Sequence, residues 1–153
     1  MRDQENRSPG MNAMSAKFFI DTNIFVYSFD ERQPDKKEKA LSIISAALQT
    51  GNGLISWQVV QEFLNVSTRK FILPLKSEDA KIYLQKVLNP LCHVFPDLDL
   101  YARALEIFEK TGYSFYDALI VASALRGECD ILYSEDFHTG HRIDGVLVLN
   151  PFV

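Results

Sequence analysis

The sequence has only two cysteines, Cys92 and Cys129, among 153 residues. This is too few for a disulfide framework or a structural zinc site, so we expect reduced core cysteines in a cytoplasmic protein. Long apolar runs are also absent: none approaches the roughly 18–20 residues that cross a bilayer. The polar first sixteen residues do not resemble a signal peptide either. We therefore predict no membrane segment, a disordered N-terminal tail over residues 1–16 and one folded domain over residues 17–153.

An excess of positive charge is missing as well. Sixteen basic residues stand against twenty acidic ones, which gives a formal net charge of −4. Non-specific binding to nucleic acid depends on surplus lysine and arginine, so this balance argues against a protein that simply coats nucleic acid. It leaves a nuclease open, because bound cations can neutralise a local cluster of carboxylates. No glycine-rich phosphate loop is present, so a nucleotide-driven enzyme is unsupported.

Short apolar segments of strand length alternate with longer segments of helical periodicity. Strands are predicted over residues 17–21, 54–56, 92–95, 131–133 and 146–149. Helices are predicted over residues 24–29, 36–48, 57–68, 77–88, 97–111 and 116–125. Ser56 is a candidate cap for the third helix, and Asn89-Pro90 is predicted to end the fourth. Strands separated by helices pair in parallel through right-handed crossovers. The predicted fold class is therefore α/β, a three-layer α/β/α sandwich with a central, mainly parallel sheet.

A few of the twenty acids lie where such folds place their sites, beyond the carboxyl ends of the strands. Asp21 ends the first predicted strand, and Asp136 lies just past a later one. Asp117 is in the first turn of an apolar helix, where the helix dipole favours a negative charge. Glu62 lies in a helix among apolar residues, where a carboxylate is costly unless it is paired. Each acid alone has a simple structural explanation, and only their combination indicates a site.

Four neighbouring carboxylates repel one another, which raises some of their pKa values. A divalent cation removes that penalty. Oxygen ligands with retained water molecules suit Mg²⁺ or Mn²⁺, which can promote hydrolysis of a phosphodiester. The acids therefore predict a site for one of these ions.

Four segments of the sequence resemble, in order and spacing, the signature blocks of the PIN domain. They are FIDTN at residues 19–23, Glu62 within its helix, YDALIVA at 116–122 and LYSEDF at 132–137. The resemblance spans about residues 17–153. The length and simple architecture are most similar to the VapC-type toxin ribonucleases of bacterial toxin–antitoxin pairs.

The resemblance implies a Mg²⁺- or Mn²⁺-dependent endoribonuclease whose catalytic and metal-binding residues are Asp21, Glu62, Asp117 and Asp136. Ser134 stands where the family has a Ser or Thr that orients the last acid, and Asn23 is expected to support Asp21. Glu135 is adjacent to Asp136 and remains an alternative last ligand. The resemblance further implies an RNA substrate, an antitoxin protein as partner, and a homodimer or higher homo-oligomer.

Several alternatives stay open. A catalytically inactive PIN-like module would bind RNA or protein without turnover, although the presence of all four acids favours the enzyme. The apolar segments 25–29 and 71–75 are either core or a surface that receives an antitoxin. A basic run that contains Arg32, Lys36, Lys37 and Lys39 is either a solvated helix face or a path that steers phosphate.

Overall fold

A computed structural model describes residues 16–153, so the predicted tail lies outside the described residues except for Ala16. The strands are β1 (Phe18–Ile20), β2 (Gly53–Ser56), β3 (Cys92–Val94), β4 (Ile131–Tyr133), β5 (Arg142–Ile143) and β6 (Val146–Leu149). They form a six-stranded sheet in the order β3-β2-β1-β4-β6-β5. All neighbours pair in parallel except β5, which is antiparallel to β6.

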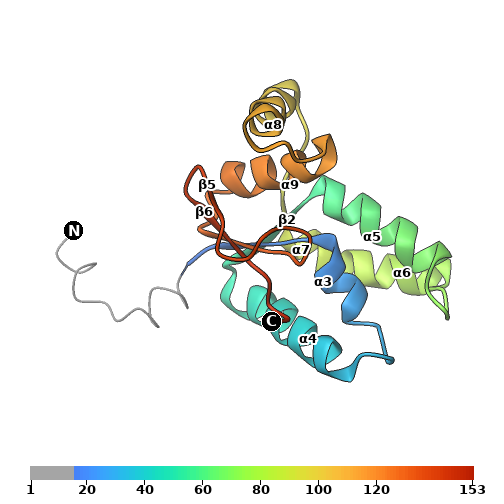
Figure 1. Cartoon of the computed structure of the whole chain (residues 1–153). Coiled ribbons are helices and arrows are strands. Elements are labelled where there is room, and N and C mark those ends of the chain that lie inside the picture. The colour runs from blue at the N-terminus through green and yellow to red at the C-terminus, as the bar shows by residue number, and fades with distance from the viewer. Residues whose placement is uncertain (1–15) are drawn as a thin grey trace.

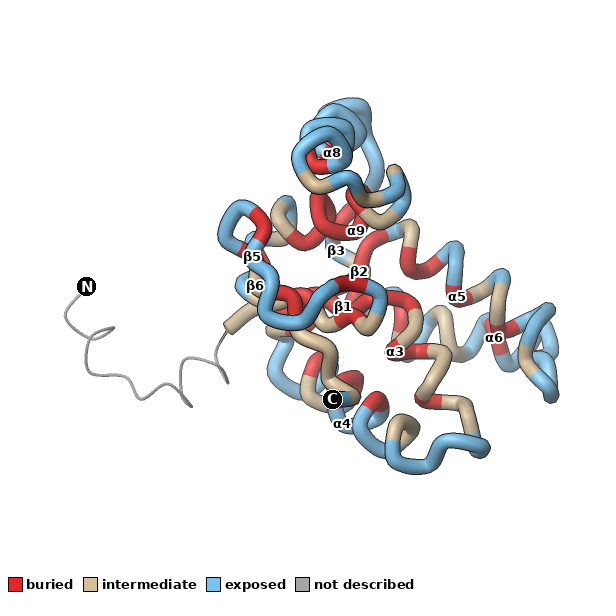
Figure 2. Tube along the Cα trace, in the orientation of Figure 1, coloured by how far each residue is buried: buried red, intermediate tan, exposed pale blue. Residues whose placement is uncertain are grey.

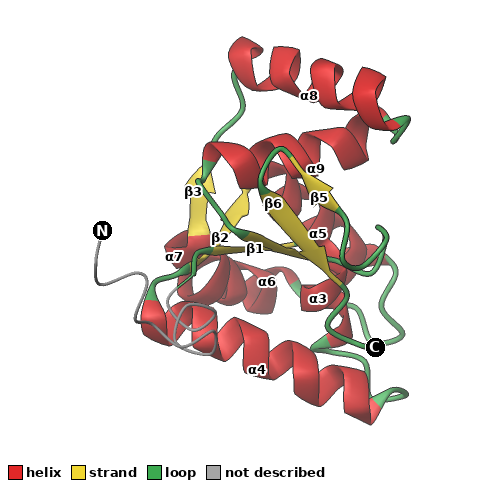
Figure 3. Cartoon of the chain, turned by 60° about the vertical axis from the view of Figure 1, so that its left-hand side comes forward, coloured by secondary structure: helices red, strands yellow, loops and turns green. Residues whose placement is uncertain are grey.

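Helices cover both faces of this sheet (Figure 1). They are α3 (Thr22–Tyr27), α4 (Pro34–Thr50), α5 (Trp57–Arg69), α6 (Ser77–Tyr83), α7 (Asn89–Leu91), α8 (Leu98–Thr111) and α9 (Phe115–Arg126), with a π-helical turn at Leu84–Leu88. Figure 3 shows α9 on one side of the sheet and α4 on the other, with α8 outside α9. The predicted three-layer α/β/α architecture is confirmed.

The core lies where the sheet meets its covering helices (Figure 2). All three residues of β1 are buried, as a central parallel strand covered on both faces requires. Helix α9 is buried along residues 118–124 because the sheet lies on one side of it and α8 on the other. Cys129 is buried and Cys92 half-buried, and both are free thiols. No helix within residues 16–153 is long and apolar enough to span a membrane.

The prediction that Asn89-Pro90 ends the fourth helix is wrong. The chain stays helical from Ser77 through Leu91, by way of α6, the π turn and α7. In the wider π turn, the N–H of Asn89 bonds to the carbonyl of Leu84. Pro90 then lies in the first turn of α7, directly after the π turn, and it has no N–H to donate within the continuous helical stretch.

Strand β5 was not predicted, although a signal for it exists. Asp144 and Gly145, both with positive φ, join β5 to β6 in a tight turn. An Asp-Gly pair between apolar residues is a strong hairpin signal, because such turns need positive φ at both positions. Arg103 and Lys110 of α8 bind the Asp144 carboxylate at 2.9 and 2.7 Å, which ties the hairpin to that helix.

Ser56 does occupy the N-cap position of α5, but its side chain makes no capping hydrogen bond. Its hydroxyl is buried and has no hydrogen-bond partner within residues 16–153. The predicted cap is therefore correct in position and wrong in its interaction.

Candidate active site

Asp21 lies at the carboxyl end of β1, where the chain passes directly into α3. It is the N-cap of α3, and its Oδ1 accepts a hydrogen bond from the Thr22 N–H at 2.7 Å. Its Oδ2 accepts a hydrogen bond from Ser134 Oγ, also at 2.7 Å. The side chain is buried, and burial raises the pKa of Asp21 from 3.8 to about 7 despite these two bonds. The nearby carboxylates of Asp136 and Glu62 raise it further. Asp21 is therefore a rigidly held acid in an environment that resists its negative charge.

Ser134 connects Asp21 to the loop that follows β4. The residue is fully buried, and its Oγ accepts a hydrogen bond from the backbone N–H of Asp136 at 3.2 Å while donating to Asp21. The Ser134 hydroxyl thus fixes the position of the Asp21 carboxylate relative to the backbone of Asp136. This contact agrees with the orienting role expected of Ser134.

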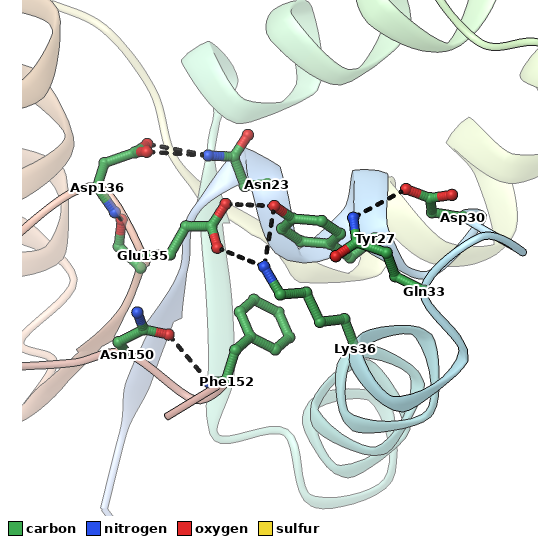
Figure 4. Close-up of polar contacts among 10 residues, drawn as sticks. Asn23, Tyr27, Asp30, Gln33, Lys36, Glu135, Asp136, Asn150 and Phe152 are labelled. Carbon is green, nitrogen blue, oxygen red and sulfur yellow. Dashed lines mark hydrogen bonds and ion pairs between the residues drawn. The ribbon is translucent and has the colours of Figure 1, made fainter.

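Asn23 contacts Asp136 instead of Asp21, which corrects the expectation for this residue. Its Nδ2 donates to both carboxylate oxygens of Asp136, at 3.2 and 3.0 Å (Figure 4). The helical turn after Asp21 directs the Asn23 side chain towards the loop after β4. The pKa of Asp136 is raised, first by partial burial of the carboxyl group and then by the charges of Asp117 and Glu135.

Glu62 belongs to α5, and its Oε1 accepts a hydrogen bond from Thr22 Oγ1 at 2.8 Å. The Glu62 residue as a whole is exposed although its carboxyl group is partly buried, whereas the buried face of α5 carries Val59, Val60, Phe63 and Ser67. The hydrogen-bond partner of the Glu62 carboxylate is therefore Thr22 of α3, which lies beside the buried face of α5. Its pKa is raised, mainly by partial burial and also by the charges of Asp117 and Asp136.

Thr22 was not predicted as a site residue. Its only sequence signal is its place between Asp21 and Asn23 in the FIDTN segment.

Asp117 lies in the first turn of α9, where the Ser114 side chain caps the helix. The backbone N–H of Asp117 donates to Ser114 Oγ at 3.1 Å. The half-buried Asp117 side chain adds negative charge that raises the pKa values of Glu62 and Asp136. Its position agrees with the prediction that this helix start faces the same rim as Asp21.

A cleft of about 280 Å³ joins these residues. All four predicted acids line it, although they come from four elements far apart in the sequence. Gln58, Asn65 and Tyr116 add polar lining, and Lys70 at the end of α5 adds a positive charge. The fold therefore brings together the whole predicted constellation.

Glu135 does not line this cleft, and Figure 4 shows its side chain directed towards Tyr27 and Lys36. Its Oε1 accepts from the hydroxyl of Tyr27 at 2.6 Å, and its Oε2 lies 3.3 Å from Lys36 Nζ. The Lys36 ammonium also lies over the rings of Tyr27 and Phe152. Glu135 therefore links α3 and α4 to the segment after β4.

The basic run beyond α3 is largely paired with nearby acids. Arg32 binds Asp30 at 3.0 Å, and Lys37 pairs with Glu31. Together with the Lys36–Glu135 pair, these contacts favour the interpretation of this run as a solvated, salt-bridged helix face.

The chemistry of the donor set suits a hard divalent cation. Carboxylate oxygens are the preferred ligands of Mg²⁺ and Mn²⁺, and a cation would offset the repulsion that raises three of these pKa values. Within residues 16–153, however, no three acidic, histidine or cysteine side chains are arranged closely enough to hold an ion as they stand.

The fold and these residues agree with one known family. The sequence model of the PIN domain matches residues 18–142. The chain belongs to the PIN domain family. The resemblance inferred from the four sequence segments is thereby confirmed. No curated protein sequence matches the chain.

Solved structures with a similar fold include several PIN proteins of toxin–antitoxin systems. A toxin–antitoxin complex from Klebsiella pneumoniae has a TM-score of 0.63 at 18% identity, covering 88% of this chain and 98% of that chain. VapBC2 from Rickettsia felis, bound to a promoter DNA fragment, has a TM-score of 0.58 at 22% identity, covering 86% and 96%. VapC20 of Mycobacterium tuberculosis, a sarcin–ricin loop cleaving toxin, has a TM-score of 0.53 at 18% identity, covering 78% and 90%. At these identities the likeness is one of fold.

Proposed function

We propose that this PIN domain is a Mg²⁺- or Mn²⁺-dependent endoribonuclease and the toxin of a toxin–antitoxin pair. The observation that carries the proposal is the single cleft lined by Asp21, Glu62, Asp117 and Asp136 at the carboxyl end of β1. Support for the toxin role comes from the similar fold of proteins that occur in toxin–antitoxin complexes. Support for RNA as substrate comes from the similar fold of a toxin that cleaves the sarcin–ricin loop.

Asp21 is held differently from Glu62 and Asp136. Asp21 is the fixed donor, because hydrogen bonds from Thr22 and Ser134 hold one of its oxygens each. Glu62 and Asp136 are exposed, and each of their carboxylate oxygens keeps lone pairs beyond its present hydrogen bonds. A divalent ion held there would activate water and stabilise the charge that develops on the phosphodiester. Lys70, in the same cleft, would pair with a phosphate of the RNA.

Asp136→Asn should slow RNA cleavage at least about ten-fold, because it removes one anionic donor from the cleft. Glu135→Gln is the matched control, since its side chain lies outside the cleft and contacts Tyr27 and Lys36. The measurement is the rate of cleavage of a structured RNA with Mg²⁺, Mn²⁺ or EDTA. Loss of activity in the Glu135 variant alone, with folding intact, would contradict the assignment of Asp136.

A catalytically inactive module is the second candidate. It is favoured by one observation, namely that the acids within residues 16–153 do not form a ready-made ion site. Such a module would bind RNA or protein but would release no RNA fragments at any concentration of Mg²⁺ or Mn²⁺. Metal-dependent cleavage by the purified wild-type chain would exclude it.

A groove of about 410 Å³ beside the cleft is the surface proposed to receive the antitoxin; its floor is apolar, and Asp30, Glu31, Arg32 and Lys70 add charged side chains to its lining. Phe29, Phe71, Ile72 and Leu73 line it, and Leu73 is 85% exposed. Val66 and Lys70 line both the groove and the acidic cleft, so an occupant of the groove would stand next to the proposed catalytic centre. We further propose a homodimer or higher homo-oligomer, which light scattering would test.

Leu73→Asp should abolish co-purification with the protein encoded by a neighbouring short open reading frame, while RNA cleavage persists. A charge at this exposed apolar side chain would have to be desolvated by the partner. Leu98→Asp is the control, because Leu98 is 82% exposed on α8 and does not line the groove. Retention of the partner by the Leu73 variant, or equal loss in both variants, would reject the groove.

A further inference from the structure

A second cavity, of about 300 Å³, adjoins the acidic cleft. Gln58 and Tyr116 line both spaces, so they form the partition between them. The aromatic side chains of Trp57, Tyr101 and Phe115 form much of the remaining wall, and no charged side chain lines the cavity. An uncharged, aromatic-lined cavity thus lies directly beside an acidic cleft.

Two residues of the cavity wall, Ser56 and Gln58, each carry a buried polar atom that has no hydrogen-bond partner within residues 16–153. One is the hydroxyl of Ser56, a residue only 2% exposed, which occupies the N-cap of α5 without capping it. The other is Oε1 of Gln58, whose Nε2 donates to the backbone carbonyl of Tyr116 at 3.2 Å. Unpaired buried polar groups are costly and uncommon, so their presence together indicates a place prepared for a polar ligand edge.

The position of Trp57 suits a planar ligand. The indole is 48% exposed, and Phe95 packs edge-on against it with ring centroids 5.8 Å apart. Phe115 likewise contacts Tyr101 and Tyr116, with centroids 6.2 and 5.7 Å apart. These aromatic contacts restrict the rings that line the cavity. The cavity is at the small end of the usual range for ligand sites, which fits a single ring system better than a peptide.

We propose that this cavity binds one unstacked nucleobase of the RNA, next to the phosphate that lies in the acidic cleft. The proposal rests on the proposed ribonuclease function. Aromatic walls stack on any base, and the hydroxyl of Ser56 with Oε1 of Gln58 would bond to the ring edge, where an N–H lies beside an acceptor. The charges of the two spaces support this assignment. The uncharged cavity would bind the uncharged base, and the acidic cleft with a bound cation would bind the phosphate.

Fluorescence of Trp57, the single tryptophan of the sequence, reports directly on this cavity. The full chain carrying Asp21→Asn would be titrated in EDTA with adenosine, guanosine, cytidine and uridine. Nucleosides are used because they lack the phosphate group, which the carboxylates of the metal-free cleft would repel. We expect saturable quenching by at least one of them, with the affinity reduced about three-fold or more by an added Ser56→Ala, which removes one hydrogen bond.

Kinetics supply the second test. Trp57→Ala should raise KM for RNA about ten-fold and change kcat less than three-fold, because stacking contributes to binding and the acids are untouched. Ser56→Ala should shift KM in the same direction, and it does not disturb the exposed surface. Phe108→Ala is the control, since Phe108 is an exposed aromatic side chain of α8 that does not line the cavity.

The outcomes separate this inference from the proposed function. If RNA is cleaved but no nucleoside quenches Trp57 and both variants keep the wild-type KM, the base site is rejected and the ribonuclease stands. If Trp57→Ala instead changes the oligomeric mass or releases the antitoxin, the cavity belongs to a protein interface and the inference is overturned. If the wild-type chain cleaves no RNA, the ribonuclease proposal fails, and the metal-free titration still decides whether the cavity binds a base.

Discussion

Replacement of Asp21 by asparagine is expected to reduce RNA cleavage about a thousand-fold or more. Asparagine has nearly the same shape and can still accept the hydrogen bond from the Thr22 N–H, so the change removes mainly the negative charge. Asp21 is the buried, fixed member of the acidic cleft. A divalent ion supplies several kcal/mol of charge stabilisation in phosphodiester hydrolysis, and each ~1.4 kcal/mol corresponds to ten-fold in rate.

The control for this prediction is Asp99→Asn, which makes the same chemical change at an exposed residue of α8. Both variants would be assayed on structured RNA with Mg²⁺ and with Mn²⁺, and their folding compared by circular dichroism. Near-wild-type cleavage by the Asp21 variant would reject the assignment of the cleft as the catalytic centre. Asp21→Ala should be equally inactive but less stable, because it leaves both the Thr22 N–H and the Ser134 hydroxyl without their acceptor, whereas asparagine can still accept from one of them.

The second large effect concerns the stability of the metal-free protein as the pH rises. The pKa of Asp21 is raised by burial from 3.8 to about 7, so the folded state binds a proton that the unfolded state releases between these values. Stability from this group is therefore complete below about pH 4 and is lost as the pH rises to about 7. One pKa unit corresponds to about 1.4 kcal/mol, so the free energy of unfolding should fall by about 4 kcal/mol over this pH range.

Urea unfolding in EDTA at pH 5 and pH 8 measures this loss, and the comparison with Asp21→Asn identifies the part that depends on the Asp21 carboxyl group. The variant should lack this part of the decline and be the more stable protein at pH 8. Mg²⁺ should restore the wild type at pH 8, since the ion binds the ionised carboxylate, and should help the variant much less. Parallel stability profiles of the two proteins would contradict the raised pKa of Asp21.

Local sequence patterns were sufficient for most of the fold. Strands β4 and β6 have the predicted bounds, and the helices α5 and α9 agree within one residue at each end. These elements are short apolar runs or strongly periodic segments, for which the pattern of burial follows directly from the sequence. Errors arose where the backbone departs from a simple rule. Pro90 is tolerated because a π turn precedes it, and the two-residue β5 is too short to show alternation.

The acidic positions could also be selected from the sequence, because strand ends and a helix start determine where Asp21, Asp117 and Asp136 must lie. The contacts that these acids make could not be predicted from the sequence. Thr22 bonds to Glu62 across forty positions, and Asn23 reaches Asp136 across more than a hundred. Such pairs depend on how α3, α5 and the loop after β4 pack together, which no local pattern encodes.

The choice between Glu135 and Asp136 shows the same division between sequence and tertiary structure. The sequence by itself determined that a PIN fold is present, through its four signature segments, and it selected Asp21, Asp117 and Asp136 as residues of one rim, because strand ends and a helix start lie there. Only the tertiary structure decided that Glu135 turns to Tyr27 and Lys36 while Asp136 faces the cleft. The physical reason is that adjacent side chains leave the backbone in different directions. What each one meets is determined by elements about a hundred residues away, and so by packing.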